Sequence, residues 1–318
     1  MPEALQQRLA FLLVDQFSLM SYAAVIEPFR AANALAGRDL YVWQHVGLGG
    51  KQVSASSGIT FMPDSGLDAA LPADTLFVFA AGALRPAVKR PFASWLRKLG
   101  RSGTVVAGVS AGPYIIADAG LLDGYRATIH WDHREDFEER YPAIVHEEAL
   151  FVIDRNRITC AGGMAGMDLA IELIRRDHGH DLAARLSDWF IRPDPRTADR
   201  PQRAGVGTRY GVKDSRLLQA LAVMEDRMEF PASRAELAQS AGLSVRQLER
   251  VFSKELGTTI AGQYRAIRLE KAAHLLRTTT RPATDIALSC GFASNSHFAR
   301  SFRQAYRTTP GRYRGLLA

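Results

Sequence analysis

Hydrophobic and polar positions follow two different patterns along the 318 residues of the chain. In roughly the first 190 residues, short apolar runs predict strands that are buried on both faces: RLAFLLVD, YVWQHVGL, TLFVFAA and TVVAGVS. Between these runs, residues 20–35 and 88–99 have helical periodicity, and a longer helix is expected near 167–176. This alternation predicts a doubly wound α/β domain with a mostly parallel sheet over residues 1–195.

The pattern changes near residue 192. Residues 192–210 are rich in Pro, Gly and Arg and have no periodicity, which predicts an interdomain linker with bounds at 196–212. From residue 213 to 318 the periodicity is helical throughout, which predicts an all-α second domain.

The second domain contains a weak internal repeat. ELAQSAGLSVRQLERVFSKELGTT begins at Glu236, and DIALSCGFASNSHFARSFRQAYRTT begins at Asp285. Each copy predicts a short helix, a turn at Gly242 or Gly291, and a second helix. Because the tight turn of a helix-turn-helix unit requires a positive φ, a glycine is expected there.

Polar residues mark where the helices of the repeat begin. Ser244 and Ser294 are expected to be N-caps of the second helices. Ser244 with Gln247, and Ser233 with Glu236, have the spacing of a capping box. The residues at helical spacing that should face the core are Leu248, Phe252, Phe298 and Phe302. The outer faces of the two second helices then carry Arg246, Gln247, Glu249 and Arg250, and Asn295, Ser296, His297 and Arg300.

Charge divides the chain in the same way. From Val206 onward there are 18 Lys and Arg against 9 Asp and Glu, a net charge of +9, whereas the rest of the chain carries −2. A basic module attached to a nearly neutral one favours a polyanion such as double-stranded DNA as partner. Arg and Asn donors match guanine and adenine edges. The alternative for any single outward Arg is a phosphate contact or a solvated side chain.

This region resembles the AraC/XylS regulator family. The resemblance rests on SxRxLxRxF at 244–252, GF at 291–292, FARSF at 298–302 and TPGRYR at 309–314. It implies two recognition helices that enter successive major grooves on one face of promoter DNA.

The first domain carries a strand, a sharp turn and a helix around Ser110, which lies between small residues that permit a strained elbow. GVSAGPY at 108–114 and TIHW at 128–131 resemble the ThiJ/PfpI branch of the class I glutamine amidotransferase-like superfamily, over residues 8–190. The resemblance implies a flavodoxin-like sheet and an oxyanion-type N–H near Gly82. Together the two resemblances identify the chain as a GlxA-type AraC/XylS regulator.

The chain departs from that enzyme branch at two positions. The elbow residue is Ser110 instead of cysteine, and Ser21 occupies the position of the acid. Glu27 lies six residues further, about 240° around the helix, and should not substitute. Ser110 and His130 then form a pair with no orienting carboxylate, so no catalytic residues are expected. Ser110 has three alternatives: a helix N-cap, a ligand contact or a catalytic group.

The leading hypothesis is a transcription regulator whose disarmed domain binds a small metabolite. The expected pocket residues are Ser21, Gly82, Ser110, Ala111, His130 and Trp131. Core packing is the favoured interpretation of Tyr22, Trp43, Tyr114 and Trp131, and an aromatic cage for a quaternary amine is the alternative. An amino acid is the other effector class. Competing hypotheses are an active PfpI-type hydrolase or amidase with an accessory DNA-binding domain, and a dimerisation platform without a ligand.

The sequence argues against a metal site, a membrane-spanning segment, secretion and a disulfide framework. His and acidic residues in HWDHREDFEERYP at 130–142 lack metal-ligand spacing and predict a charged surface helix, and no cofactor is expected. No apolar run approaches the ~20 residues that span a bilayer, and the start lacks a secretory signal. Cys160 and Cys290 do not indicate a disulfide framework. A cytoplasmic homodimer is expected, with RNA polymerase as a candidate partner.

Overall fold

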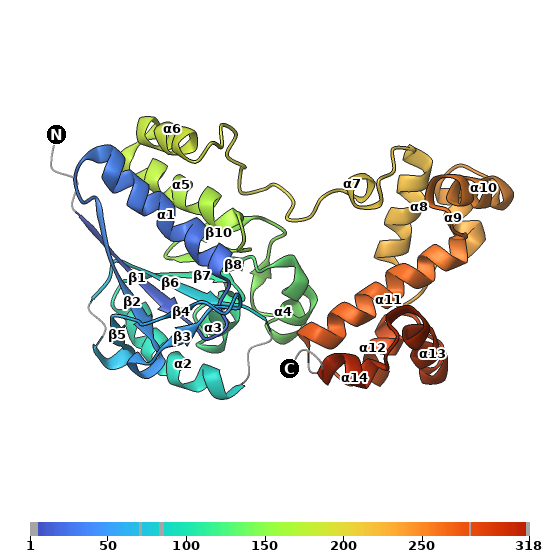
Figure 1. Cartoon of the computed structure of the whole chain (residues 1–318), viewed down its shortest axis with the longest axis horizontal. Helices are drawn as coiled ribbons and strands as arrows, with labels where there is room; N and C mark the ends of the chain where they lie inside the picture. Colours follow the sequence, from blue (N-terminus) through green and yellow to red (C-terminus); the bar gives the residue numbers. More distant parts are fainter. Residues whose placement is uncertain (1–5, 70–71, 83–85, 280, 316–318) are drawn as a thin grey trace. The chain divides into compact units, whose positions relative to one another are not determined.

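The computed structural model describes residues 6–69, 72–82, 86–279 and 281–315 (Figure 1). The chain divides into two compact units, Met1–Gln202 and Arg203–Ala318. The division falls inside the segment expected to be a linker.

The first unit is built on a seven-stranded sheet with the order β10-β11-β7-β6-β1-β2-β5. Within this sheet, β10 and β11 pair antiparallel, and every other pair of neighbouring strands is parallel. The strands are β1 (Gln7–Leu13), β2 (Tyr41–Gly47), β5 (Ser65–Gly66), β6 (Thr75–Ala80), β7 (Val105–Ser110), β10 (Phe151–Asp154) and β11 (Arg157–Cys160). This arrangement confirms the predicted doubly wound, mostly parallel α/β fold.

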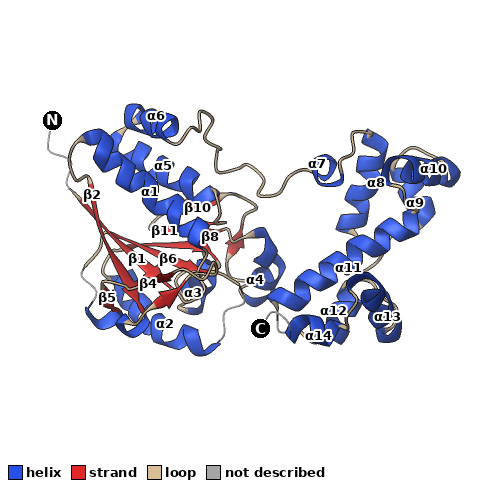
Figure 2. Cartoon of the chain, in the orientation of Figure 1, coloured by secondary structure: helices blue, strands red, loops and turns tan. Residues whose placement is uncertain are grey.

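Helices cover both faces of the sheet (Figure 2). In β1, Leu9, Phe11 and Leu13 pack into one hydrophobic cluster while Ala10 and Leu12 pack into the other, as expected for a strand buried on both sides. The first cluster includes α1 (Leu19–Ala36), α5 (Ala165–His178) and α6 (His180–Trp189). The second includes α2 (Pro86–Arg101), α3 (Gly112–Asp118) and α4 (Arg134–Arg140).

Shorter elements connect these layers. They are β3 (Val53–Ser54), β4 (Thr60–Phe61), β8 (Arg126–Ala127) and β9 (Val145–His146), with the 3-10 turns η1 (Leu48–Gly50), η2 (Leu67–Ala69) and η3 (Trp131–His133). η3 and α4 form the charged helical segment that the sequence predicts at 130–142.

All regular elements in the described part of the second unit are helices: α7 (Val206–Tyr210), α8 (Ser215–Asp226), α9 (Arg234–Ser240), α10 (Val245–Leu256), α11 (Ile260–Thr278), α12 (Ala283–Ser289), α13 (Asn295–Tyr306) and α14 (Pro310–Gly315). Two hydrophobic clusters meet on α11. Ile267 belongs to the cluster of α8, α9 and α10, and Leu269 belongs to the cluster of α12 and α13. Each cluster is the core of one helix-turn-helix unit, as the repeat predicts.

The local signals in the repeat are confirmed. Gly242 and Gly291 have φ of 64° and 70°. The Ser244 and Ser294 hydroxyls cap α10 and α13, and both capping boxes are present. The four predicted core residues are at most 2% exposed: Leu248, Phe252, Phe298 and Phe302.

Candidate functional site

Ser110 ends β7 and turns the chain sharply into α3. Its φ is 60°, a left-handed conformation that costs a non-glycine residue about 1–2 kcal/mol. The turn is held because the Ala111 N–H donates to the Ala80 carbonyl oxygen at 3.1 Å. A Cβ at Gly112 would clash with the Val78 carbonyl oxygen, so only glycine lets α3 begin so close to β6. The structure thus contains the elbow that the sequence predicts.

The loop after β11 packs directly on this elbow. A Cβ at Gly162 would lie 2.6 Å from the Ser110 Cβ and 2.9 Å from the Ser21 Oγ. The next residue, Gly163, donates its N–H to the Ser21 Oγ at 2.8 Å. Ser21 and Ser110 therefore lie close together at the carboxyl ends of the parallel strands, where open α/β folds bind ligands. Sequence analysis missed this loop, although two glycines after a buried strand are a signal for close backbone approach.

Hydrogen bonds and an ion pair define the surroundings of Ser21, Glu27 and His130. Ser21 is 2% exposed, and its hydroxyl oxygen accepts the Gly163 N–H. Glu27 pairs with Arg30 at 2.8 Å on the helix surface. The Nδ1 atom of His130, which an orienting carboxylate would contact in a triad, accepts the backbone N–H of Asp132 at 3.3 Å.

The other expected pocket residues have different environments. Gly82 is exposed and has a φ of 66°. It lies two residues after Ala80, the residue of β6 that pairs with Ser110 of β7. Trp131 is 40% exposed, and its ring lies 5.4 Å from the His130 ring between centroids. Ala111, in contrast, is fully buried in the hydrophobic cluster that includes α2, α3 and α4, so its side chain belongs to the core.

Cys160 lies one strand away from the elbow but has the character of a core residue. It is fully buried, and burial raises the pKa of its thiol to about 12. Its sulfur is 3.4 Å from the Gly162 nitrogen. Because the thiolate is the nucleophilic form, Cys160 does not replace the cysteine that the enzyme branch carries at the elbow.

The four aromatic residues considered for a cage do not come together, and core packing, the favoured interpretation, is confirmed for Tyr22 and Tyr114. Tyr22 and Trp43 pack on one face of the sheet, whereas Tyr114 packs on the other. The Tyr22 hydroxyl lies 2.8 Å from the His45 Nε2. Burial raises the pKa of Tyr22 to about 12. Trp131 is the exposed member of the four.

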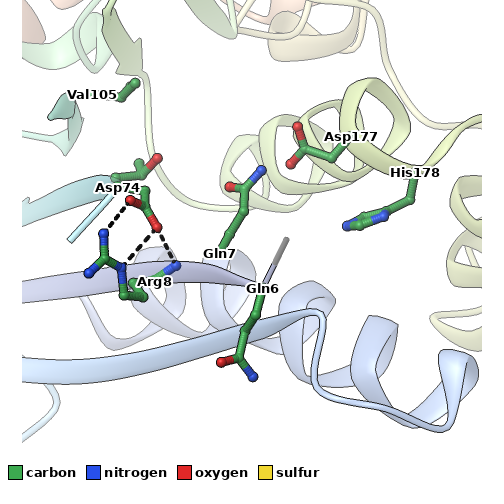
Figure 3. Close-up of a pocket in the computed structure, with 8 residues that line it drawn as sticks. Gln6, Gln7, Arg8, Asp74, Val105, Asp177 and His178 are labelled. Carbon is green, nitrogen blue, oxygen red and sulfur yellow. Dashed lines mark hydrogen bonds and ion pairs between the residues drawn. The ribbon is translucent and has the colours of Figure 1, made fainter. Parts of the chain in front are cut away.

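A separate open hollow of about 710 Å³ lies at the amino ends of the strands, on the opposite side of the sheet from the elbow (Figure 3). Gln7, Thr75 and Val105, the first residues of β1, β6 and β7, line it. Arg8 and Asp74, which also line it, form an ion pair at 2.8 Å. Because it lies at the amino ends of the strands and shares no lining residue with the elbow, we do not assign the ligand site to it. Within the described residues, no cluster of three His, Cys, Asp or Glu side chains could hold a metal.

The second unit presents two helices with exposed polar faces. Arg246, Gln247 and Arg250 on α10 are exposed, as are Asn295, Ser296, His297 and Arg300 on α13. Glu249 differs, because it is half-buried and its carboxylate accepts the Ile260 N–H at 3.2 Å at the start of α11. Glu249 thus joins α10 to α11, a long-range contact that helical periodicity does not reveal.

Comparisons with known proteins match both units. The helix-turn-helix domain model matches residues 237–315, and the DJ-1/PfpI family model matches residues 7–176. The HTH-type transcriptional regulator CdhR of Pseudomonas aeruginosa is 40% identical over 307 residues, covering 96% of this chain and 91% of that protein. The HTH-type transcriptional regulator GlxA of Rhizobium meliloti is 38% identical, covering 97% and 95%.

Solved structures agree with this match. An AraC family transcriptional regulator from Pseudomonas putida is 26% identical, covers 58% of this chain and 99% of its own, and has a TM-score of 0.54. A THiJ/PfpI family protein from Pseudomonas syringae, with a TM-score of 0.51 and 20% identity over 76% of this chain and 90% of its own, shares the fold.

Proposed function

This chain belongs to the family of HTH-type transcriptional regulators that join a DJ-1/PfpI domain to a helix-turn-helix domain, and we propose that a small metabolite bound at the Ser110 elbow controls it. The chain is a DNA-binding regulator, as its family is. The proposal adds where the effector binds, which residues contact DNA, and that no reaction occurs at the elbow.

The retained elbow is the observation that carries the proposal. Ser110 keeps a positive φ although Ser21 and His130 are engaged in ways that leave a triad incomplete. Backbone strain of this kind persists where a binding or catalytic site maintains it. A strained serine at the carboxyl ends of the strands therefore supports a ligand contact.

The surroundings of the elbow favour an effector with an apolar or cationic group. Met20 and Met164 flank Ser21 and Gly163 in sequence and are 56% and 42% exposed, and Trp131 is exposed as well. Thioether and indole groups suit a quaternary amine or the side chain of an amino acid. We propose these two classes as effectors.

DNA contact is assigned to the exposed faces of α10 and α13. Arg246 and Gln247 have long side chains that can reach base edges, whereas Arg250 and Arg300 suit phosphates. Asn295, Ser296 and His297 on α13 are shorter and would combine base contacts with backbone contacts. We propose that the chain acts in the cytoplasm as a homodimer on promoter DNA and contacts RNA polymerase there. No helix in the described ranges is long and apolar enough to cross a membrane.

A thermal-shift screen of the full chain tests the ligand site. Glycine betaine and L-arginine represent the two effector classes, and a panel of related amines and amino acids extends them. A ligand at 100 times its Kd should stabilise the unit that binds it by about 2.7 kcal/mol. Ser110→Leu should abolish the shift, whereas Ser57→Leu, at an exposed serine of the same unit, should keep it.

Two results would contradict the proposal. A shift that persists in Ser110→Leu would place the ligand elsewhere. Turnover of an ester or amide substrate that Ser110→Ala abolishes would favour the alternative of an active hydrolase with an accessory DNA-binding domain.

A further inference from the structure

The chain leaves the first unit along residues 192–202, which we call the strap. At its start, two arginines bind the buried carboxylate of Asp168. Arg192 lies 2.6 Å and Arg196 lies 2.8 Å from Asp168, whose side chain is fully buried. Asp168 belongs to the first turn of α5, which begins directly after Gly162 and Gly163. The start of the strap is therefore attached to the helix that carries one loop of the elbow site.

At its end, Gln202 binds segment 128–131, which includes the expected pocket residues His130 and Trp131. Its side-chain Nε2, which has two N–H donors, lies within hydrogen-bond distance of three acceptors: the Ala149 carbonyl oxygen at 2.7 Å, the Ile129 carbonyl oxygen at 3.0 Å and the Thr128 Oγ1 at 3.1 Å. Its Oε1 accepts the Trp131 N–H at 2.7 Å. One side chain thus holds segment 128–131, which includes His130, over more than 70 residues of sequence.

The middle of the strap is also attached. The Leu150 N–H donates to the Ala198 carbonyl oxygen at 2.7 Å, and Ala198 packs against the hydrophobic cluster of α1 and α5. The segment expected to be a flexible linker is therefore fixed on the first unit as far as Gln202. Three residues, 203–205, separate this anchor from α7.

Helix α7 is in turn fixed within the second unit. Arg209 pairs with Glu225 of α8 at 2.6 Å, and the Tyr210 hydroxyl donates to the same carboxylate at 2.8 Å. Only residues 203–205 therefore connect the anchored Gln202 of the first unit to the anchored helix α7 of the second unit.

We propose that the strap couples the effector site to the DNA-binding unit and that Gln202 is its coupling residue. The proposal rests on the proposed function. A ligand that moves His130 or Trp131 must either carry Gln202 along or break its hydrogen bonds, so the ligand has different affinities for the attached and released strap. Coupling of this kind is reciprocal, so DNA bound to the second unit must alter segment 128–131 in return.

The residue directly before the strap has a strained backbone conformation. Ile191, the residue before the strap, has a φ of 53° and is 91% exposed. A β-branched residue with this φ is an outlier that the hydrogen bonds of Ile191 to Asp188 and Arg192 to Ser187 keep in place. This strained residue belongs to the C-terminal cap of α6, from which the strap begins.

Hydrogen exchange on the full chain tests the coupling without knowledge of the effector. The probe is a DNA duplex enriched by the wild-type chain from a random library. Adding it should change exchange in segment 128–131 by about fivefold or more, the lower range of allosteric coupling. In Gln202→Ala the Trp131 amide should exchange faster without DNA, and the DNA-dependent change should disappear although the duplex still binds. Gln52→Ala, at an exposed glutamine of the same unit, should behave as wild type.

The outcomes separate the two proposals. If the wild type binds the duplex and segment 128–131 does not respond, or responds equally in Gln202→Ala, the coupling is overturned while DNA binding stands. If no duplex is enriched, DNA recognition itself fails and the coupling falls with it. Should Gln202→Ala lose its cooperative unfolding transition, Gln202→Glu is scored instead. It keeps the acceptor for Trp131 and loses the donors, so a DNA response as large as that of the wild type would also overturn the coupling.

Discussion

Adding one methyl group at Gly162 should damage the elbow far more than adding it at the neighbouring Gly163. Both glycines have positive φ, 86° and 54°. A Cβ at Gly162 would lie 2.6 Å from the Ser110 Cβ and 3.0 Å from the Ser110 Cα, whereas a Cβ at Gly163 meets no atom within 4 Å. The two substitutions therefore share backbone strain and differ in steric overlap.

The magnitudes follow from these two terms. Positive φ costs an alanine about 1–2 kcal/mol, and overpacking against atoms that cannot rotate away costs about 1–3 kcal/mol more. Gly162→Ala should thus destabilise by about 2–5 kcal/mol and Gly163→Ala by about 1–2 kcal/mol. In a unit of this size each kcal/mol lowers Tm by about 2–4 °C.

Calorimetry of the full chain measures this difference. The transition of the first unit should fall in both variants, with the larger fall in Gly162→Ala, and the transition of the second unit should not move. Equal shifts in the two variants would refute the close packing of Gly162 on Ser110 and, with it, the geometry assigned to the ligand site.

Three further predictions concern other parts of the chain. Arg246→Ala should relax base preference at one position of the selected site, at about 1–3 kcal/mol, whereas Arg300→Ala should weaken binding evenly across sequences; selection experiments that give the reverse would exchange their roles. Ile191→Gly should stabilise the first unit by about 1 kcal/mol in chemical denaturation, because glycine adopts this φ without strain; an unchanged midpoint would contradict that. Burial lowers the pKa of His146 below 6.5, so the stability associated with neutral His146 is present above pH 6.5 and is lost as pH falls through the lowered pKa; His146→Gln should flatten the pH profile of unfolding, and an identical profile would count against the burial.

Features with a local origin could be predicted from the sequence. The capping boxes at Ser233 and Ser244 depend on side chains three residues apart, and the turns at Gly242 and Gly291 depend on one residue each. The buried strands and the elbow at Ser110 were predictable for the same reason, since small residues between a strand and a helix determine the turn.

Contacts between distant segments could not be predicted in this way. Gln202 binds Thr128 across 74 residues, and Arg196 binds Asp168 across 28. Neither pair has a periodic signal, and a Pro-rich, Arg-rich segment without periodicity resembles a free linker. The alternative of an aromatic cage stayed open for a related reason, because sequence position alone does not tell which face of the sheet Tyr22 and Tyr114 occupy.

DNA recognition by two helix-turn-helix units is tested by footprinting of the full chain on the enriched duplex over a series of salt concentrations. Each protomer should protect two short segments about 10 base pairs apart on one face of the DNA. Neutralising roughly 6–8 phosphates should give a log–log salt slope of about −5 to −7. A single protected segment per protomer, or a slope near zero, would contradict the claim.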